Sequence, residues 1–198
     1  LIMHQINIIE SLGINNIAIV TGYLRDQLEG LGYTTYHNKE YENTNMVYSL
    51  FCGVQYLKER DDDLIISYGD IVYEKKNLEL LIETDGDIVV MVDDNWLDLW
   101  SLRNENPLLD AETMKFDDKG YISELGGKAK NLLEIESQYT GLIKISNKVI
   151  NPLISFYYEL DPNKIYNGKS FNQIYLTDFL QLLIKSGWKI KPAHVSGG

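Results

Sequence analysis

The segment from Leu64 to Glu74 contains the residue best placed to do chemistry, Asp70. A short apolar run ends at Tyr68-Gly69-Asp70, and further apolar residues follow at once. This pattern predicts a buried strand that delivers the Asp70 carboxylate to the carboxyl edge of an α/β sheet, where such sheets bind ligands. A lone carboxylate there could bind Mg²⁺ that carries the phosphates of a nucleotide. Mg²⁺ takes one or two carboxylates and fills its other coordination positions with water and phosphate oxygens. The alternative is a turn residue that only caps the next segment.

Composition and charge exclude several classes of protein. The chain has 198 residues, of which 44% are hydrophobic and 24% charged, as is typical of globular proteins. Its formal net charge of −11 argues against nucleic acid or an anionic membrane as a partner, since both require basic patches. No apolar run reaches membrane-spanning length. The single Cys52 rules out an internal disulfide and favours a reducing cytoplasm.

Hydrophobic periodicity predicts the elements that position Asp70. Strands are expected over 17–20, 33–36, 88–92 and 142–145 and in the run before Gly69, and helices over 2–12, 24–31, 47–57, 77–83, 148–158 and 172–186. Asn43 or Thr44 is expected to cap the helix over 47–57. Residues 96–125 are expected to form short extended pieces joined by turns. Strands alternating with helices indicate a three-layer α/β fold, and the absence of a linker predicts a single domain over 1–198.

Short motifs along these elements carry a resemblance to a known family. They are Leu1-Ile2, Val20-Thr21-Gly22-Tyr23, Asn43-Thr44-Asn45-Met46, Tyr68-Gly69-Asp70-Ile71, Gly127-Lys128, Tyr139-Thr140-Gly141-Leu142 and Tyr175-Leu176-Thr177-Asp178. In their order and spacing, the chain resembles the nucleotidyltransferases of GT-A-like fold, above all the small cytidylyltransferases that activate phosphocholine or aminoalkylphosphonates. Residues 96–115 are similar to a narrower branch that acts on L-glutamine phosphate. The resemblance implies a Rossmann-like nucleotidyltransferase domain with a mostly parallel mixed sheet.

Both ends of the chain depart from the family's pattern. Members begin with a strand, a Gly-rich loop carrying an Arg and a Lys-Pro pair ahead of the position of Leu1, and they carry a second metal-binding Asp shortly after that of Gly198. By this resemblance the sequence is expected to be an internal fragment that lacks a central strand, the phosphate-cradling loop and half of the metal site. The piece alone is therefore expected to be inactive and poorly stable.

The resemblance also assigns roles to single residues. Asp70 is expected to be the catalytic Mg²⁺ ligand, and Lys128 to steady the acceptor phosphate as a point charge. Nucleotide contacts are expected from two loops, through Asn43, Thr44, Asn45, Tyr68 and Gly69. The structural alternatives are a solvated lysine at position 128 and simple helix capping by the first loop.

The acceptor pocket is expected to use aromatic and charged side chains, namely Trp96, Asp98, Trp100, Arg103, Asp110, Glu112 and Tyr139. Aromatic faces suit a quaternary ammonium, whereas an amino-acid phosphate requires carboxylates for its ammonium and an arginine for its carboxylate. The alternatives are packing for the tryptophans and surface pairing for the charges.

The expected activity is Mg²⁺-dependent transfer of CMP from CTP to a small phosphorylated or phosphonate metabolite, with release of pyrophosphate. In-line attack by the acceptor phosphate requires positioning and charge neutralisation, without a covalent enzyme intermediate. The product would serve capsule, lipopolysaccharide or phosphonate synthesis. Two alternatives stay open, a sugar-1-phosphate nucleotidyltransferase and a non-catalytic nucleotide-binding module. Gly127 counts against the first, because sugar-specific relatives often have Glu at this position. A homodimer is also left open.

Overall fold

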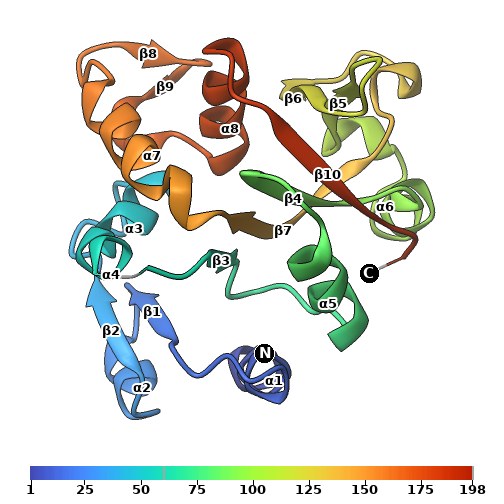
Figure 1. Cartoon of the computed structure of the whole chain (residues 1–198). Helices are drawn as coiled ribbons and strands as arrows, with labels where there is room; N and C mark the ends of the chain where they lie inside the picture. Colours follow the sequence, from blue (N-terminus) through green and yellow to red (C-terminus); the bar gives the residue numbers. More distant parts are fainter. Residues whose placement is uncertain (60, 198) are drawn as a thin grey trace.

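The strands of the computed structural model, which describes residues 1–59 and 61–197, fall into one central sheet and several two-stranded pairs. They are β1 (Ala18–Thr21), β2 (Thr34–His37), β3 (Leu64–Ser67), β4 (Ile88–Asp93), β5 (Glu112–Phe116), β6 (Ile122–Lys128), β7 (Gln138–Ile145), β8 (Ile165–Tyr166), β9 (Lys169–Ser170) and β10 (Ile190–Val195). The central sheet has the order β10-β4-β7-β3 (Figure 1). Within it β10 and β4 are parallel, and β7 runs antiparallel to both β4 and β3. The prediction of an α/β fold with a mixed sheet is confirmed.

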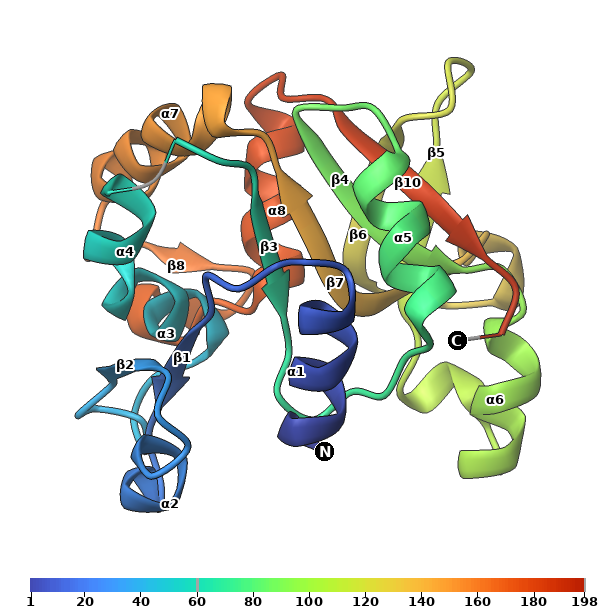
Figure 2. The same cartoon turned by 60° about the horizontal axis from the view of Figure 1, so that its bottom comes forward.

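Helices lie on both faces of the central sheet and beside the β1–β2 pair (Figure 1 and Figure 2). They are α1 (Ile2–Ser11), α2 (Arg25–Glu29), α3 (Met46–Cys52), α4 (Val54–Lys58), α5 (Lys75–Glu83), α6 (Trp96–Arg103), α7 (Asn147–Glu159) and α8 (Leu176–Lys185), with 3₁₀ turns η1 (Pro107–Leu109), η2 (Leu132–Glu134) and η3 (Phe171–Gln173). In Figure 2, α1 and α5 lie in front of the sheet and α8 lies behind it. Among the described residues, no helix combines the length and apolar character needed to cross a bilayer.

The core is divided between the two faces of β4, every residue of which is buried. Because side chains alternate along a strand, Val89 and Met91 pack with Leu78 of α5 on one face. Val90 packs with Phe179 of α8 on the other face, in the larger cluster. This double burial explains why β4 is apolar at almost every position rather than alternating.

Two local predictions were wrong. Residues 96–103 form α6, not an extended piece. The helical signal was present, since Asp98 lies in the first turn and Arg103 in the last, where each charge complements the helix dipole. The helix expected over 47–57 is divided into α3 and α4 at Gly53, and its cap is Asn45, whose side chain accepts from the Met46 N–H at 2.9 Å.

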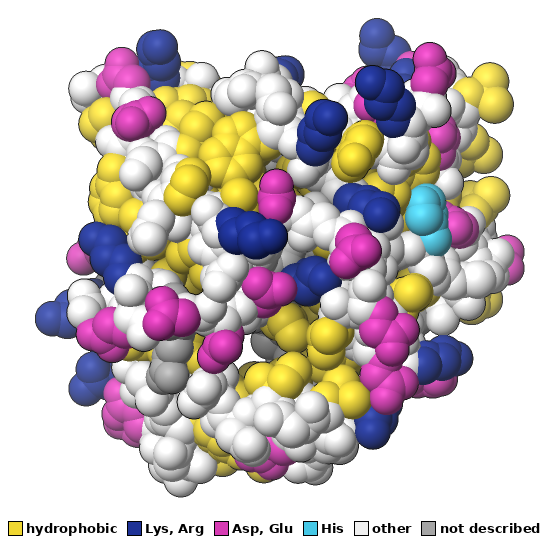
Figure 3. All heavy atoms as spheres, in the orientation of Figure 1, with side chains coloured by type: hydrophobic (Ala, Val, Ile, Leu, Met, Phe, Trp, Pro, Cys, Tyr) yellow, Lys and Arg dark blue, Asp and Glu magenta, His cyan; other side chains and the backbone are white. Residues whose placement is uncertain are grey.

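The β1–β2 pair stands apart from the central sheet. Within residues 1–59 and 61–197, β1 pairs only with β2 and β3 pairs only with β7, so each of these two strands has one edge without a ladder partner. A groove of about 790 Å³ lies between them, lined largely by apolar residues of α1, β1 and β3. The space-filling view shows a hollow with hydrophobic side chains along it in the lower half of the molecule (Figure 3). This groove separates the two sheets.

Candidate active site

One edge of the central sheet gathers several of the predicted site residues. Because β7 runs antiparallel to β3 and β4, its beginning lies at the edge where those two strands end. Asp70 follows β3, Asp93 is the last residue of β4, and Tyr139 is near the start of β7. Open α/β sheets bind their ligands at this edge. The predicted metal ligand and one predicted acceptor residue therefore share an edge.

Asp70 lies in an exposed turn, and no described residue forms a hydrogen bond or an ion pair with its carboxylate. Within 1–59 and 61–197, no cluster of three or more His, Cys, Asp or Glu side chains could hold a metal ion. A single exposed carboxylate nevertheless fits Mg²⁺, which needs one or two carboxylates and takes its remaining oxygens from water and phosphate. The donor set fits a metal ion that arrives with a nucleotide, not a cage built by the protein alone.

Two tyrosines lie beside this turn. The Tyr68 and Tyr139 rings meet edge to face, with centroids 5.7 Å apart. The Tyr68 hydroxyl donates to Met46 Sδ at 3.2 Å, and the Tyr139 hydroxyl is buried beside the Tyr68 side chain. Burial raises the pKa of both phenols well above the ordinary value, so both stay protonated at neutral pH. Tyr68 and Tyr139 are therefore neutral aromatic neighbours of the turn that carries Asp70.

Glu112 adds a carboxylate to the same region. The Thr177 hydroxyl donates to Glu112 Oε1 at 3.4 Å. Burial is the main cause that raises the pKa of Glu112, and the nearby Asp178 charge acts in the same direction while Lys169 opposes it. No ion pair with Glu112 is formed within the described residues. The arrangement is a partly desolvated carboxylate that a cationic ligand group would stabilise.

A buried ion pair lies next to Glu112, and sequence reasoning missed half of it. Asp178, whose side chain is 4% exposed, pairs with Lys169 Nζ at 2.9 Å and accepts from Asn167 Nδ2 at 2.6 Å. It also accepts from the Tyr175 N–H at 3.3 Å, so Asp178 caps the first turn of α8. Lys169 Nζ lies 4.2 Å from the centre of the Tyr175 ring. Nothing local in the sequence marks Lys169, because its partners come from another element.

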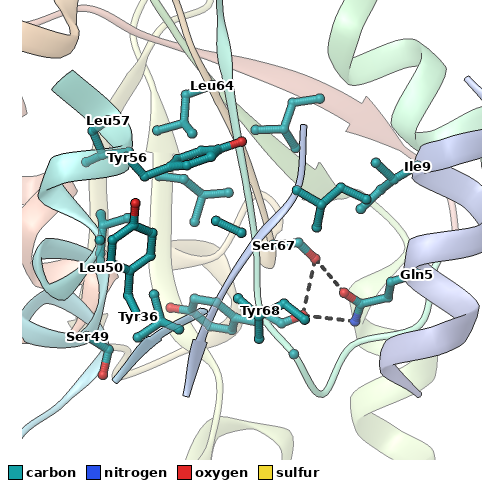
Figure 4. A pocket seen from close by; sticks show the side chains of 18 of the residues that line it. Gln5, Ile9, Tyr36, Ser49, Leu50, Tyr56, Leu57, Leu64, Ser67 and Tyr68 are labelled. Atoms are coloured by element: carbon teal, nitrogen blue, oxygen red, sulfur yellow. Dashed lines mark hydrogen bonds between the residues drawn. The ribbon is translucent and has the colours of Figure 1, made fainter. Parts of the chain in front are cut away.

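The predicted nucleotide loop lies at one end of the groove between β1 and β3. Thr44, Asn45, Tyr68 and Gly69 all line it, and Figure 4 shows the groove with Tyr68 inside. Asn43 is exposed and is not part of the lining. The bond from Tyr68 to Met46 joins this loop to the turn that carries Asp70. The structure thus brings four of the five predicted nucleotide residues together.

Lys128 and its neighbour Gly127 end β6. Lys128 is exposed and stands opposite Glu112 in the β5–β6 ladder. A Cβ atom at Gly127 would lie 2.6 Å from Thr113 Oγ1, the atom that accepts the Gly127 N–H at 3.0 Å. A side chain at position 127 would therefore displace Thr113, which is the physical reason for a glycine at that position.

The α6 residues of the predicted acceptor set lie apart from the two tyrosines. Trp96 is 4% exposed and belongs to a small buried cluster with Trp100 packed against it. The Arg103 guanidinium lies 5.9 Å from the Trp100 ring centre, and Asp98 accepts from Asn95 at 2.9 Å. Asp110 is exposed after η1. Within the described part of the chain, Trp96 and Trp100 belong to a different hydrophobic cluster from Tyr68 and Tyr139. The acceptor roles of the α6 residues and Asp110 stay predictions.

Comparison with known proteins agrees with this geometry. Residues 1–139 match the family described as the MobA-like NTP transferase domain. The chain is 42% identical over 205 aligned positions to a CTP:phosphoglutamine cytidylyltransferase of Campylobacter jejuni subsp. jejuni serotype O:2, covering 100% of this chain and 81% of that protein. The fold is similar to the inositol-1-phosphate CTP transferase of T. maritima, with a TM-score of 0.68, 17% identity, and coverage of 98% of this chain and 71% of the other. The chain belongs to the MobA-like NTP transferase family and is a nucleotidyltransferase.

Proposed function

We propose that the protein transfers CMP from CTP to the phosphate of a small zwitterionic metabolite and releases pyrophosphate. The observation that carries this proposal is the 42% identity, over the whole chain, with a CTP:phosphoglutamine cytidylyltransferase. L-glutamine phosphate is accordingly the first acceptor to test, ahead of phosphocholine and aminoalkylphosphonates. We assign this role to a single nucleotidyltransferase domain over 1–198, and place the reaction in the cytoplasm, where CTP is made.

In this proposal an oxygen of the acceptor phosphate attacks the α-phosphorus of CTP. The bond from that phosphorus to the oxygen bridging to the β-phosphate breaks, and pyrophosphate leaves with the electron pair. Asp70 would hold Mg²⁺, which when bound polarises the α-phosphorus and neutralises the leaving charge. Lys128 would steady the acceptor phosphate, and the loop of Asn43, Thr44 and Asn45 would contact the nucleotide. Placed cations matter here because the net charge of −11 repels polyanions.

The acceptor's ammonium group would bind at Glu112. This carboxylate is partly desolvated and lies near Tyr68 and Tyr139, so a cation at this position would regain lost electrostatic stabilisation. Attack on phosphorus requires no proton transfer from the protein, and catalysis is then a matter of alignment. In this proposal the phosphate of the acceptor binds at Lys128 and its ammonium group binds at Glu112.

The proposal is tested by measuring pyrophosphate release from the full-length protein with Mg²⁺ and CTP. The acceptors are L-glutamine phosphate, phosphocholine, an aminoalkylphosphonate and two sugar-1-phosphates. We expect turnover with a zwitterionic acceptor, and a fall in kcat of about 10²-fold or more in Asp70→Asn, since a metal ligand supplies several kcal/mol of charge stabilisation. Asp118→Asn, in the exposed β5–β6 turn, is the matched control and keeps full activity.

Three results would contradict the proposal, each in a different way. Turnover with sugar phosphates alone would make the protein a sugar-1-phosphate nucleotidyltransferase. Binding of CTP without turnover of any acceptor would leave a nucleotide-binding module. Full activity of Asp70→Asn would show that Asp70 is not the metal ligand, although the protein would still be a nucleotidyltransferase.

A further inference from the structure

The turn that carries Asp70 has backbone carbonyls that neither a strand nor a helix satisfies. The carbonyls of Tyr68 and Ile71 stand on either side of Gly69-Asp70, after the last ladder residue of β3. A carbonyl shielded from water requires a hydrogen-bond donor. Both carbonyls accept from one side chain, Gln5 of α1, whose Nε2 lies 2.9 Å from Tyr68 O and 2.7 Å from Ile71 O. The Ser67 hydroxyl also lies 3.2 Å from Tyr68 O. One amide group thus bridges the turn.

A third hydrogen bond fixes the orientation of this amide. Ser67 Oγ donates to Gln5 Oε1 at 3.0 Å, and Figure 4 marks the hydrogen bonds that join Gln5 to Ser67 and to Tyr68. Flipping the amide would point its oxygen at two carbonyl oxygens and its NH₂ at the hydroxyl, so only one orientation satisfies all three partners. Gln5 is 2% exposed, so these hydrogen bonds are largely shielded from bulk water. The bridge therefore holds the amide in one orientation.

The opposite side of the turn is held by β7. The Tyr68 N–H donates to Gly141 O at 3.1 Å. The Tyr68 ring occupies the space a side chain at Gly141 would need, since a Cβ there would lie 3.2 Å from the ring. The turn is clamped between α1 and β7, and only its tip, with the unpaired Asp70 carboxylate, is exposed.

We infer that Gln5 is a positioning residue that sets the direction of the Asp70 carboxylate and so the affinity of the metal site. The inference rests on the proposed role of Asp70 as the metal ligand. Hydrogen-bonding partners behind a metal ligand determine its orientation, and their removal weakens metal affinity about 10- to 100-fold. A neutral amide suits this position because a lysine or arginine bridging the same carbonyls would place a positive charge near the metal.

The test replaces Gln5 by Met, which is similar in length and apolar but forms none of the three hydrogen bonds. The matched control is Lys144→Met. Lys144 is 7% exposed and likewise bridges two backbone carbonyls, Ile82 O at 2.7 Å and Thr84 O at 2.5 Å. It lies near the end of β7 opposite to Tyr139. Both variants lose buried hydrogen bonds, but only one lies at the proposed metal ligand.

The measured quantity is the dissociation constant of Mn²⁺ with the full-length protein and CTP, from electron paramagnetic resonance of free Mn²⁺. We expect Gln5→Met to weaken Mn²⁺ binding about 10-fold or more, with a parallel rise in the Mg²⁺ concentration at half-maximal turnover. Lys144→Met should bind Mn²⁺ like the wild type although urea unfolds it earlier. Ser67→Ala keeps both bonds from Gln5 to the turn, and should weaken Mn²⁺ binding less than Gln5→Met; it serves as the second variant if Gln5→Met does not fold.

Two patterns would overturn the inference. Unchanged Mn²⁺ affinity in both Gln5→Met and Ser67→Ala would show that the bridge does not act on the metal site. Equal weakening in Lys144→Met would show that any loss of stability has the same effect. Unchanged Mn²⁺ affinity in Asp70→Asn is distinguishable from both, because it would reject the proposed metal site itself together with the role of Gln5.

Discussion

Glu112 is the residue at which stability and the proposed chemistry oppose each other. Burial raises the pKa of its carboxyl, so the folded protein holds this proton more tightly than the unfolded chain does. Above the folded-state pKa the protein carries a desolvated charge that destabilises it. Below about pH 4, where the carboxyl is protonated in both states, this destabilisation is absent. Functional groups often carry such a cost in stability.

Replacing Glu112 with Gln should therefore stabilise the protein and weaken acceptor binding. We expect a higher urea midpoint than wild type at pH 7 to 8, with the difference shrinking as the pH falls toward about 4. The KM for an ammonium-bearing acceptor should rise about 10-fold, since a charge-assisted hydrogen bond is lost. Urea titrations across pH and steady-state kinetics measure the two effects.

The control for this prediction is Glu124→Gln on the neighbouring strand β6. Glu124 is substantially exposed and lies 4.0 Å from Lys115, and such surface pairs contribute little. A Glu112→Gln variant that is less stable than wild type at pH 7 would contradict the predicted stabilisation. A variant that keeps the wild-type KM would show that Glu112 does not bind the acceptor.

Among the elements, β7 positions Tyr139 through an irregular pairing with β4. Val90 faces Ile143, but Val92 faces Tyr139, so β7 covers the same length of β4 with extra residues. Gly141 lies within this bulge with a φ of +96°, in the region that favours glycine. Bulges change the direction of side chains near active sites. Here the bulge lies between the core part of β7 and Tyr139.

Substitution of Gly141 by Ala tests how tightly this bulge and the Tyr68 turn are packed. Alanine would be strained by the positive φ at this position, and its Cβ would lie 3.2 Å from the Tyr68 ring. We expect a loss of about 2–4 kcal/mol in unfolding free energy. Gly120→Ala has a similar φ of +77° but meets no atom within 4 Å, so it should cost only about 1 kcal/mol. Urea denaturation of both variants gives the comparison; equal losses would show that Tyr68 moves aside freely.

In the molecule as a whole, stability is expected to be uneven between the two sheets. Every residue of β4 is buried, whereas β2 has no buried residue and α2 has none either. Regions with few buried contacts open locally at low free energy, while a buried central strand exchanges only on global unfolding. Figure 1 shows α2 and β2 at one end of the molecule, away from the central sheet.

Hydrogen–deuterium exchange of the full-length protein measures this difference. Amides of α2 and β2 should exchange at least about 100-fold faster than those of β4. Addition of CTP and Mg²⁺ should slow exchange in the Tyr68–Ile71 turn if the nucleotide binds there, and leave β4 unchanged. Uniform exchange rates across the two sheets would mean that they unfold as one cooperative unit.

Local sequence patterns predicted much of the secondary structure and the family of this protein. Apolar periodicity predicted α1, α5, α7 and the strands around them, because a face that must be buried repeats at the period of its element. The family resemblance, carried by short motifs such as Tyr68-Gly69-Asp70-Ile71, was confirmed by the match over residues 1–139. The cap at Asp178 was also a local signal.

Tertiary structure decided the rest, because hydrogen-bond partners and clashes join residues far apart in the chain. Gln5 satisfies carbonyls more than sixty positions away. Lys169 and Asp178 are only nine positions apart, but they belong to different elements, β9 and α8, and meet through the fold. The groove lies between an edge of β1 and an edge of β3 that have no ladder partner among the described residues. Sequence fixes which side chains can bind, accept or pack; the fold alone determines which of them meet, since contact depends on topology and not on spacing along the chain.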